Sequence, residues 1–381
     1  MYHFRNSQNY ANITTMIDRR LIQNFDWVLL GLVVIICATG IVNLYSAGYN
    51  RGEGTPLYIK QLYWLGVGLG VMFVTLTYDY RHLEKLSYPF YIICILLLVA
   101  VMFGGKMVSG SRRWLPLGPL AFQPSELAKI AIILALAAYF NRRPRTEDMG
   151  LKELIVPGVM VMIPVALIIK QPDLGSGILV ALVAGSIILF VGVQWRTLVG
   201  CGLTLVMLSP LIWHLLKDYQ RQRVLTFLDP GRDPLGAGYH ILQSMIAVGS
   251  GQFWGKGFLQ GTQSQLYFLP EQHTDFVFSV FAEEWGFVGS GVLLLLFTAL
   301  ALWGLSVARD CKERFGHLLA VGVTALIFWQ IFINLCMVTG FLPVVGIPLP
   351  LFSYGGSSLI TTLLGVGFLL NIRMRRYLFG G

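Results

Sequence analysis

Apolar stretches long enough to cross a lipid bilayer recur along this chain and constrain its fold more than any other feature. A helix needs about 20 apolar residues to span the hydrocarbon. Ten segments of the 381-residue sequence have this character: 26–47, 60–78, 87–104, 124–141, 153–170, 174–193, 196–216, 276–308, 315–340 and 356–372. Hydrophobic residues make up 55% of the chain and charged residues 12%, which is unlike a soluble domain. Because lipid cannot satisfy open backbone groups, we expect an all-α polytopic membrane protein with ten transmembrane helices.

The predicted organisation is one membrane domain, 26–372, between polar tails at 1–25 and 373–381. The first tail has no apolar core, so it does not resemble a cleavable signal peptide. The segment 276–308 is too long for one straight span, so its first turns should lie at the interface or inside a cavity. The connection 217–275, between helices seven and eight, spans nearly sixty residues. Loops of this length are usually functional or disordered, and its aromatic residues favour order.

Basic residues predict the orientation of the chain. Ten spans place both termini on one face, and the loops on that face contain Arg81, Lys85, Arg142, Arg143, Arg145, Arg196, Arg309, Lys312 and Arg314. By the positive-inside rule both ends are cytoplasmic, and the loop 217–275 is periplasmic. The net charge of +9 is therefore mostly a topology signal. Aromatic residues are not interleaved with these basic loops, so no nucleic-acid partner is expected.

The five cysteines predict neither a disulfide nor a metal site. Four of them lie inside apolar spans and Cys311 lies in a short basic loop. No pair occurs on the outer side, where an oxidising compartment would favour a bridge.

Four polar clusters interrupt the apolar pattern, and the predicted topology places all of them on the outer face. They occupy 111–129, 170–177, 217–275 and 348–358. Each cluster alone is a weak signal, but their convergence on one face indicates a functional site there.

Asp275 is the residue on which this interpretation depends most. It ends a polar run, 269–275, that leads directly into the apolar Phe276. A carboxylate at the lip of a membrane helix is costly to desolvate and usually marks a site. The alternative is a helix N-cap, a position that suits both Thr274 and Asp275. His273 either orients this carboxylate or bonds to backbone.

Cations near these clusters are candidates for binding an anion. Arg113, preceded by Arg112, lies in a short outer loop beside Trp114, which favours an anion or sugar site over a solvated loop. Arg221 and Arg223 begin the long loop and would contact either substrate or lipid headgroups.

Two further positions have both a structural and a functional interpretation. Glu126 and Lys129 lie three residues apart, on one face of a helix that Pro124 can start. They form a structural ion pair, or Lys129 faces a cavity and helps to neutralise an anion, or both. Ser357 follows two glycines at the start of the last helix, which is either a plain helix start or an anion site.

One prominent carboxylate among cations suits a particular reaction class. A sugar diphosphate is a good leaving group once cations offset its charge, so a single base that deprotonates the attacking hydroxyl is enough. Glycoside hydrolysis normally needs two carboxyl groups. The pattern therefore favours glycosyl transfer from a lipid diphosphate, with inversion at the anomeric carbon.

These motifs closely resemble the SEDS family of bacterial cell-wall proteins (shape, elongation, division and sporulation), over nearly the whole chain after the first twenty residues. The resemblance is carried by Arg-Trp at 113–114, Gln-Pro-Ser-Glu-Leu-Ala-Lys at 123–129, Gln-Pro-Asp-Leu-Gly at 171–175, Pro-Glu-Gln-His-Thr-Asp-Phe at 270–276, the run 341–350, and Ser-Tyr-Gly-Gly-Ser-Ser at 353–358. The runs 226–230 and 343–346 are more similar to elongation-type members than to division-type members.

The resemblance implies a peptidoglycan glycosyltransferase of the bacterial inner membrane that polymerises lipid II, the undecaprenyl-diphosphate disaccharide-pentapeptide, during cell elongation. By motif, the essential aspartate of the family corresponds to Asp275. Other functionally important positions of the family correspond to Arg113, Trp114, Glu126 and Lys129. The implied partners are lipid II, the nascent glycan strand and a class B penicillin-binding protein, a single-pass transpeptidase.

The expected mechanism uses Asp275 to deprotonate the 4-hydroxyl of N-acetylglucosamine on an incoming lipid II. Arg113 and Lys129, with or without a divalent cation such as Mg²⁺ or Mn²⁺, would offset the charge of the leaving diphosphate. A lipid-linked sugar flippase, a purely structural scaffold and a division-type member of the family are the alternatives. Polar clusters on a single face favour catalysis over transport.

Overall fold

The structure, a computed structural model, describes residues 24–49, 56–108, 111–117, 120–143, 149–229, 231, 233, 236–266, 268 and 271–376. Most of the predicted N-terminal tail, the last five residues of the C-terminal tail, and Pro230 and Pro270 of the quoted motifs lie outside the described residues, as does the side chain of Arg112.

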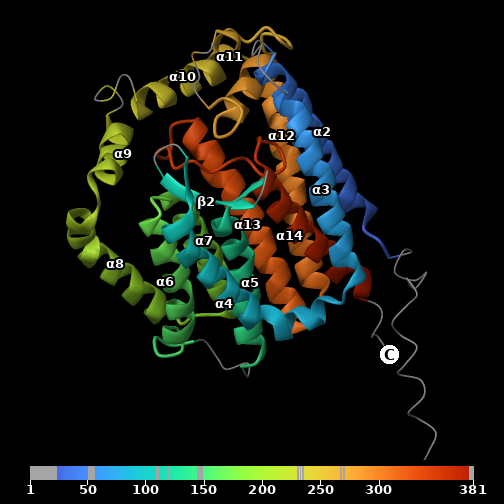
Figure 1. Cartoon of the computed structure of the whole chain (residues 1–381), viewed down its shortest axis with the longest axis vertical. Coiled ribbons are helices and arrows are strands. Elements are labelled where there is room, and N and C mark those ends of the chain that lie inside the picture. Colours follow the sequence, from blue (N-terminus) through green and yellow to red (C-terminus); the bar gives the residue numbers. More distant parts are fainter. Residues whose placement is uncertain are drawn as a thin grey trace, which may run out of the picture.

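The described chain is nearly all helical (Figure 1). Its helices are α2 (Trp27–Ala47), α3 (Leu57–Thr77), α4 (Tyr80–Gly104), α5 (Pro124–Asn141), α6 (Ile155–Lys170), α7 (Leu174–Val191), α8 (Trp195–Leu215), α9 (Asp218–Leu228), α10 (Ala237–Ser250), α11 (Thr262–Gln265), α12 (Val277–Asp310), α13 (Arg314–Val338) and α14 (Gly356–Arg375).

Each of the ten predicted apolar segments coincides with one of these helices, and the long connection contains α9, α10 and α11. Within the described residues, eight helices are long and apolar enough to cross a membrane, whereas α6 and the 195–211 part of α8 are shorter apolar helices. The fold is therefore that of a multi-pass membrane protein, and the count of ten spans stays a prediction.

A small antiparallel sheet departs from the all-helical expectation. Its strands, β1 (Lys106–Val108), β2 (Ser111–Leu117) and β3 (Leu120–Phe122), pair in the order β1-β2-β3 between α4 and α5. Open strand edges are excluded only from the hydrocarbon region of a membrane. Strands are therefore compatible with a loop beyond the helix ends.

Three helices form the centre of the bundle. α5, α13 and α14 are the most buried of the candidate spans, and α14 packs along α3 and α13 while α5 packs against α4, α7 and α13. Small residues permit this packing. A Cβ added to Gly322 of α13 would lie 2.5 Å from Ile133 of α5, and one added to Gly68 of α3 would lie 2.5 Å from Leu363 of α14.

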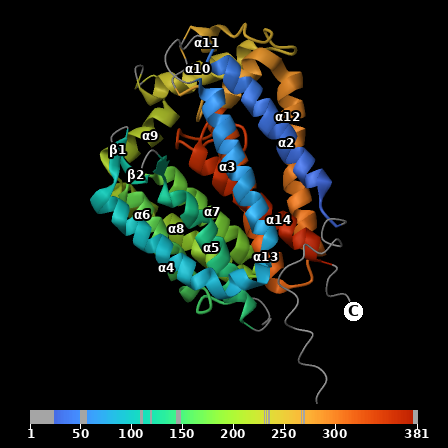
Figure 2. The ribbon, with the colours of Figure 1, turned by 45° about the vertical axis from the view of Figure 1, so that its right-hand side comes forward.

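Helices α8, α9 and α10 form an arc beside this bundle (Figure 1), and Figure 2 shows α10 and α11 at the top of the molecule, near the upper end of α12. Every described side chain of α8 from Leu198 to His214 is exposed, whereas α10 packs against α12. The arc therefore joins the bundle through α10, and α8 stands apart from it.

The long helix α12 is broken near its start. Gly286 has φ 64° and ψ −160°, which is not helical. The backbone of 252–257 occupies the break: Lys256 N and Gly257 N donate to the carbonyls of Glu283 and Glu284, each at 3.0 Å, and Phe287 N donates to Gln252 O at 2.9 Å. The expectation that this segment is not one straight helix is thus confirmed, whereas the placement of its first turns at the interface or in a cavity stays a prediction.

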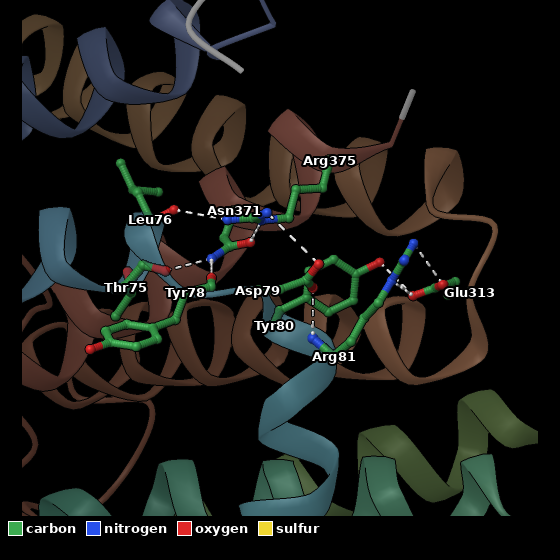
Figure 3. A network of polar contacts seen from close by, with 9 residues as sticks. All are labelled: Thr75, Leu76, Tyr78, Asp79, Tyr80, Arg81, Glu313, Asn371 and Arg375. Atoms are coloured by element: carbon green, nitrogen blue, oxygen red, sulfur yellow. Dashed lines mark hydrogen bonds and ion pairs between the residues drawn. The ribbon is translucent and has the colours of Figure 1, made fainter. Parts of the chain in front are cut away.

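The end of the bundle that contains the α3–α4 turn, the α12–α13 turn and the end of α14 is joined by a polar network (Figure 3). Asn371 Nδ2 donates to Thr75 O and Tyr78 O, each at 2.5 Å. Arg375 lies 3.7 Å from Asp79, and Arg81 forms an ion pair with Glu313 at 2.8 Å. We call this the network end, and the end that contains Asp275 the site end.

Candidate functional site

Asp275 lies in the turn 271–276 that precedes α12. The residue at the N-cap of α12 is Phe276, and no side chain makes a capping hydrogen bond there. The helix-capping interpretation of Asp275 is therefore wrong. The backbone of Asp275 is held from α13 instead, because Asn334 Nδ2 donates to its carbonyl oxygen at 2.9 Å.

One side of the Asp275 carboxylate faces the segment 345–347, which links α13 to α14. Gly346 has φ +73°, and a Cβ added to it would lie 3.4 Å from Asp275 Oδ2. Only glycine adopts such a backbone conformation readily. On its other side the segment contacts the start of α7, where a Cβ on Gly175 would lie 2.4 Å from Val345 O. The carboxylate is thus part of a tightly packed corner.

The surroundings of Asp275 raise the pKa of its carboxyl group from 3.8 to about 6. Burial is the main cause, the negative charges of Glu271 and Asp173 add to it, and the positive charges of Arg223 and Arg113 oppose it. A carboxylate with a pKa near neutrality is suited to general-base chemistry. The positive charges of Arg113 and Arg223, both of the predicted site, therefore act on the Asp275 carboxyl group.

Arg113 attaches the β-sheet to the α6–α7 turn. Its guanidinium donates to Gln171 O at 3.4 Å and to Pro172 O, and lies 3.9 Å from Asp173. Asp173 in turn accepts a hydrogen bond from Ser176 N at 3.2 Å and so caps α7. Arg113 therefore has a structural task in this state and contributes positive charge to the Asp275 corner.

Glu126 and Lys129 form a closed ion pair. Lys129 Nζ lies 2.7 Å from Glu126 Oε1, and the side chains are 2% and 5% exposed. The structural interpretation of this pair is therefore the one that the geometry supports, and Lys129 does not reach an open site here. Removing one member of such a pair is strongly destabilising because it leaves a buried charge uncompensated.

The other predicted site residues are distributed around the corner. Arg221 donates to the carbonyls of Trp213 and His214 at 3.0 and 2.6 Å, so it closes the end of α8 and does not join the Asp275 group. Trp114 is half-buried in β2, and Ser357 is buried in the first turn of α14.

His273 connects the Asp275 turn to the segment before α14. Its carbonyl accepts a hydrogen bond from Tyr354 N at 2.9 Å, and its ring lies 6.1 Å from the Tyr354 ring. The ring nitrogen Nε2 lies 4.0 Å from a carboxylate oxygen of Glu271. His273 therefore packs within the corner, next to the carboxylate that neighbours Asp275.

The adjacent acids of α12, Glu283 and Glu284, both have side-chain hydrogen-bond partners. Glu283 is fully buried and accepts from Lys256 at 2.7 Å and from donors at 262–264. Glu284 accepts a hydrogen bond from Ser46. Glu283 therefore fastens the α10–α11 connection to α12, and Glu284 links α12 to α2.

Two residues of the corner were not predicted from the sequence. Asn334 and Gly346 define the position of the Asp275 turn, yet neither belongs to a polar cluster on the outer face. An asparagine inside the apolar segment 315–340 was the available signal, because polar groups in membrane helices are costly. Among the described residues, no group of three or more His, Cys, Asp or Glu side chains is arranged to hold a metal ion.

Comparison with known proteins supports the resemblance drawn from the motifs. Residues 19–378 match the model of the FtsW/RodA/SpoVE family, described as cell cycle proteins. The peptidoglycan glycosyltransferase MrdB of Escherichia coli is 46% identical over 354 residues, which cover 91% of this chain and 93% of that protein.

Solved structures share the fold. A chain from a structure that describes the coordination of polymerization and crosslinking by a peptidoglycan synthase complex superposes with a TM-score of 0.81 at 38% identity, and covers 93% of this chain and 98% of that chain. The crystal structure of the rod shape determining protein RodA from Thermus thermophilus has a TM-score of 0.69 at 34% identity, with the same coverage.

Proposed function

The chain belongs to the FtsW/RodA/SpoVE family, and we propose that it is a peptidoglycan glycosyltransferase that polymerises lipid II and releases undecaprenyl diphosphate. One observation carries the proposal: the Asp275 carboxylate is packed against Gly346 in a corner where burial raises its pKa and the positive charges of Arg223 and Arg113 lower it. A single base among cations is what glycosyl transfer from a diphosphate needs. The activity named for the related MrdB supports the same reaction.

In the proposed reaction Asp275 takes the proton from the 4-hydroxyl of N-acetylglucosamine on the incoming lipid II. That oxygen attacks the anomeric carbon of N-acetylmuramic acid at the end of the growing strand. The bond from this carbon to the diphosphate breaks, and undecaprenyl diphosphate leaves with inversion. Arg223 and Arg113 offset the charge that develops on the leaving group.

The arc α8–α10 supports a lipid substrate. The described side chains of α8 from Leu198 to His214 are exposed, including Leu203, Val206 and Met207. An apolar helix that stands apart from the bundle gives a polyprenyl tail an apolar surface beside the site end. We place the site end at the periplasmic face and both termini in the cytoplasm, as the basic loops indicate.

We assign the chain to the elongation type, on the basis of the runs 226–230 and 343–346 and of its similarity to a rod shape determining protein. Its proposed partner is a class B penicillin-binding protein, and the match to a chain of a peptidoglycan synthase complex supports such an assembly. A divalent cation would be held mainly by the diphosphate oxygens of the substrate, because Asp173 is already used by its protein neighbours.

The deciding experiment is polymerisation of purified lipid II by the purified protein in proteoliposomes. Asp275→Asn removes the base and keeps the side-chain size, so we expect a loss of about 10²- to 10⁴-fold in rate. Asp218→Asn is the matched control, since the Asp218 side chain is 96% exposed, and it should keep the wild-type rate.

Equal rates in wild type and Asp275→Asn would remove Asp275 as the base. A wild-type protein that moved lipid II across the bilayer without forming glycan would favour the flippase. If the wild-type protein alone formed no glycan while its partner formed glycan at the full rate, the structural scaffold would be favoured.

A further inference from the structure

We propose that Asn334 is a positioning residue for the Asp275 carboxylate, an inference that rests on the function proposed above. Asn334 lies on α13, and its side chain is fully buried. One amide nitrogen makes two hydrogen bonds: Nδ2 donates to Asp275 O at 2.9 Å and to Ile347 O at 2.8 Å. This one nitrogen atom thereby connects α13, the Asp275 turn and the segment 345–347.

Both carbonyl groups belong to backbone that surrounds the carboxylate. The first is that of Asp275 itself, so the hydrogen bond fixes the point from which the side chain projects. The second follows Gly346, whose added Cβ would lie 3.4 Å from Asp275 Oδ2. Asn334 therefore sets the distance between the carboxylate and its neighbouring wall.

The same wall contacts the group that contains Arg113. Val345 O packs against Gly175 at the start of α7, and Asp173, which lies 3.9 Å from Arg113, caps that helix. A shift of the segment 345–347 would change the separation between the base and this cation. Catalysis is sensitive to displacements of about 1 Å, which can cost 10²-fold in rate.

The asparagine side chain is only partly satisfied at this position. Its Oδ1 is buried and has no hydrogen-bond partner among the described residues, and an unpaired buried acceptor is costly. A leucine of similar size would avoid that cost and would lack the two donated hydrogen bonds. The hydrogen bonds to the Asp275 turn and to the wall are what distinguish asparagine from leucine here.

The chain offers a matched control in Asn371. This residue is also buried in a helix, and its Nδ2 also donates to two backbone carbonyls, those of Thr75 and Tyr78. It lies at the network end (Figure 3). Replacing it tests what the loss of a buried amide clamp does when the clamp is remote from Asp275.

The experiment compares Asn334→Leu, Asn334→Asp, Asn371→Leu and Asp275→Asn as full-length proteins in proteoliposomes with purified lipid II. We expect both Asn334 variants to lose kcat by about tenfold to a hundredfold while KM stays within about twofold, because the hydrogen bonds position the base rather than bind substrate. Asn334→Asp keeps the volume and replaces the two N–H donors of the amide by at most one O–H donor, so it weakens the hydrogen bonding without the change of packing that leucine brings. Asn371→Leu should keep the wild-type kcat per folded molecule.

Wild-type kcat in both Asn334 variants would overturn the inference, and so would an equal loss in Asn371→Leu. Failure of both Asn334 variants to fold, with Asn371→Leu folded, would make the residue structural and would overturn it as well. Activity retained by Asp275→Asn would refute the proposed function itself. An inactive Asp275→Asn beside fully active Asn334 variants would refute only this inference.

Discussion

Ionisation of the Asp275 carboxyl group destabilises the folded protein. Its pKa is raised from 3.8 to about 6, mainly by burial, so folding favours the neutral acid. This destabilisation of the folded state is fully present above about pH 6 and disappears as the pH falls toward 3.8. Asp275→Asn removes it, and we expect this variant to be more stable than wild type at pH 7.5 by about 1–3 kcal/mol, with the gain shrinking toward pH 4.

Thermal unfolding of the purified protein across this pH range measures the effect. Asp218→Asn serves as the control because its carboxylate is exposed, so its unfolding temperature should follow that of wild type at every pH. A stability gain for Asp275→Asn that did not depend on pH would contradict the electrostatic explanation.

Single residues differ in how far the sequence can predict their roles. Asp275 was predicted from its place at the lip of an apolar segment, which is a local property. The sequence left open whether Lys129 forms a structural ion pair or faces a cavity. The burial of the side chain decides between the two, and burial depends on the neighbouring helices. Asn334 and Gly346 could not be predicted, since they act on Asp275 through contacts between segments about sixty to seventy residues apart.

At the level of elements, the break in α12 depends on one glycine. A Cβ on Gly286 would lie 2.2 Å from Gly255 N, and the positive φ of Gly286 disfavours any other residue. Gly286→Ala should therefore cost about 3 kcal/mol or more through strain and overpacking. Gly291→Ala in the same helix has open space and should be neutral or stabilising by up to about 1 kcal/mol. Thermal unfolding of the two variants checks this, and equal stability would show that 252–257 is not fixed at the break.

Hydropathy predicts the helices well because each span satisfies its own backbone hydrogen bonds. The sequence also indicated, by length alone, that 276–308 is not one straight span. It did not indicate where the break falls, because Gly286 is one of several glycines in that helix and only the contact with Gly255 distinguishes it. The three strands were missed because their pairing involves short runs outside the apolar segments.

Across the whole molecule, the two ends of the bundle are held together by different interactions. Ion pairs such as Arg81–Glu313 and Arg373–Asp310 dominate the network end. The site end relies on buried groups instead: amides such as Gln61, which donates to Ser353 O at 3.0 Å, the buried Lys129–Glu126 pair and close glycine contacts. Weakening the network end should therefore loosen the helix ends there and leave the Asp275 corner intact.

Arg375→Gln tests this separation. Arg375 lies 3.7 Å from Asp79 and donates to Leu76 O at 3.2 Å (Figure 3), so its loss should destabilise the α3–α4 turn by about 1–3 kcal/mol. Hydrogen–deuterium exchange by mass spectrometry should show faster exchange at that turn, unchanged exchange at 343–350 and a wild-type polymerisation rate. Arg309→Gln, which replaces an exposed arginine of α12, should change none of these. Faster exchange at 343–350 in Arg375→Gln would mean that the two ends move as one unit and would refute the separation.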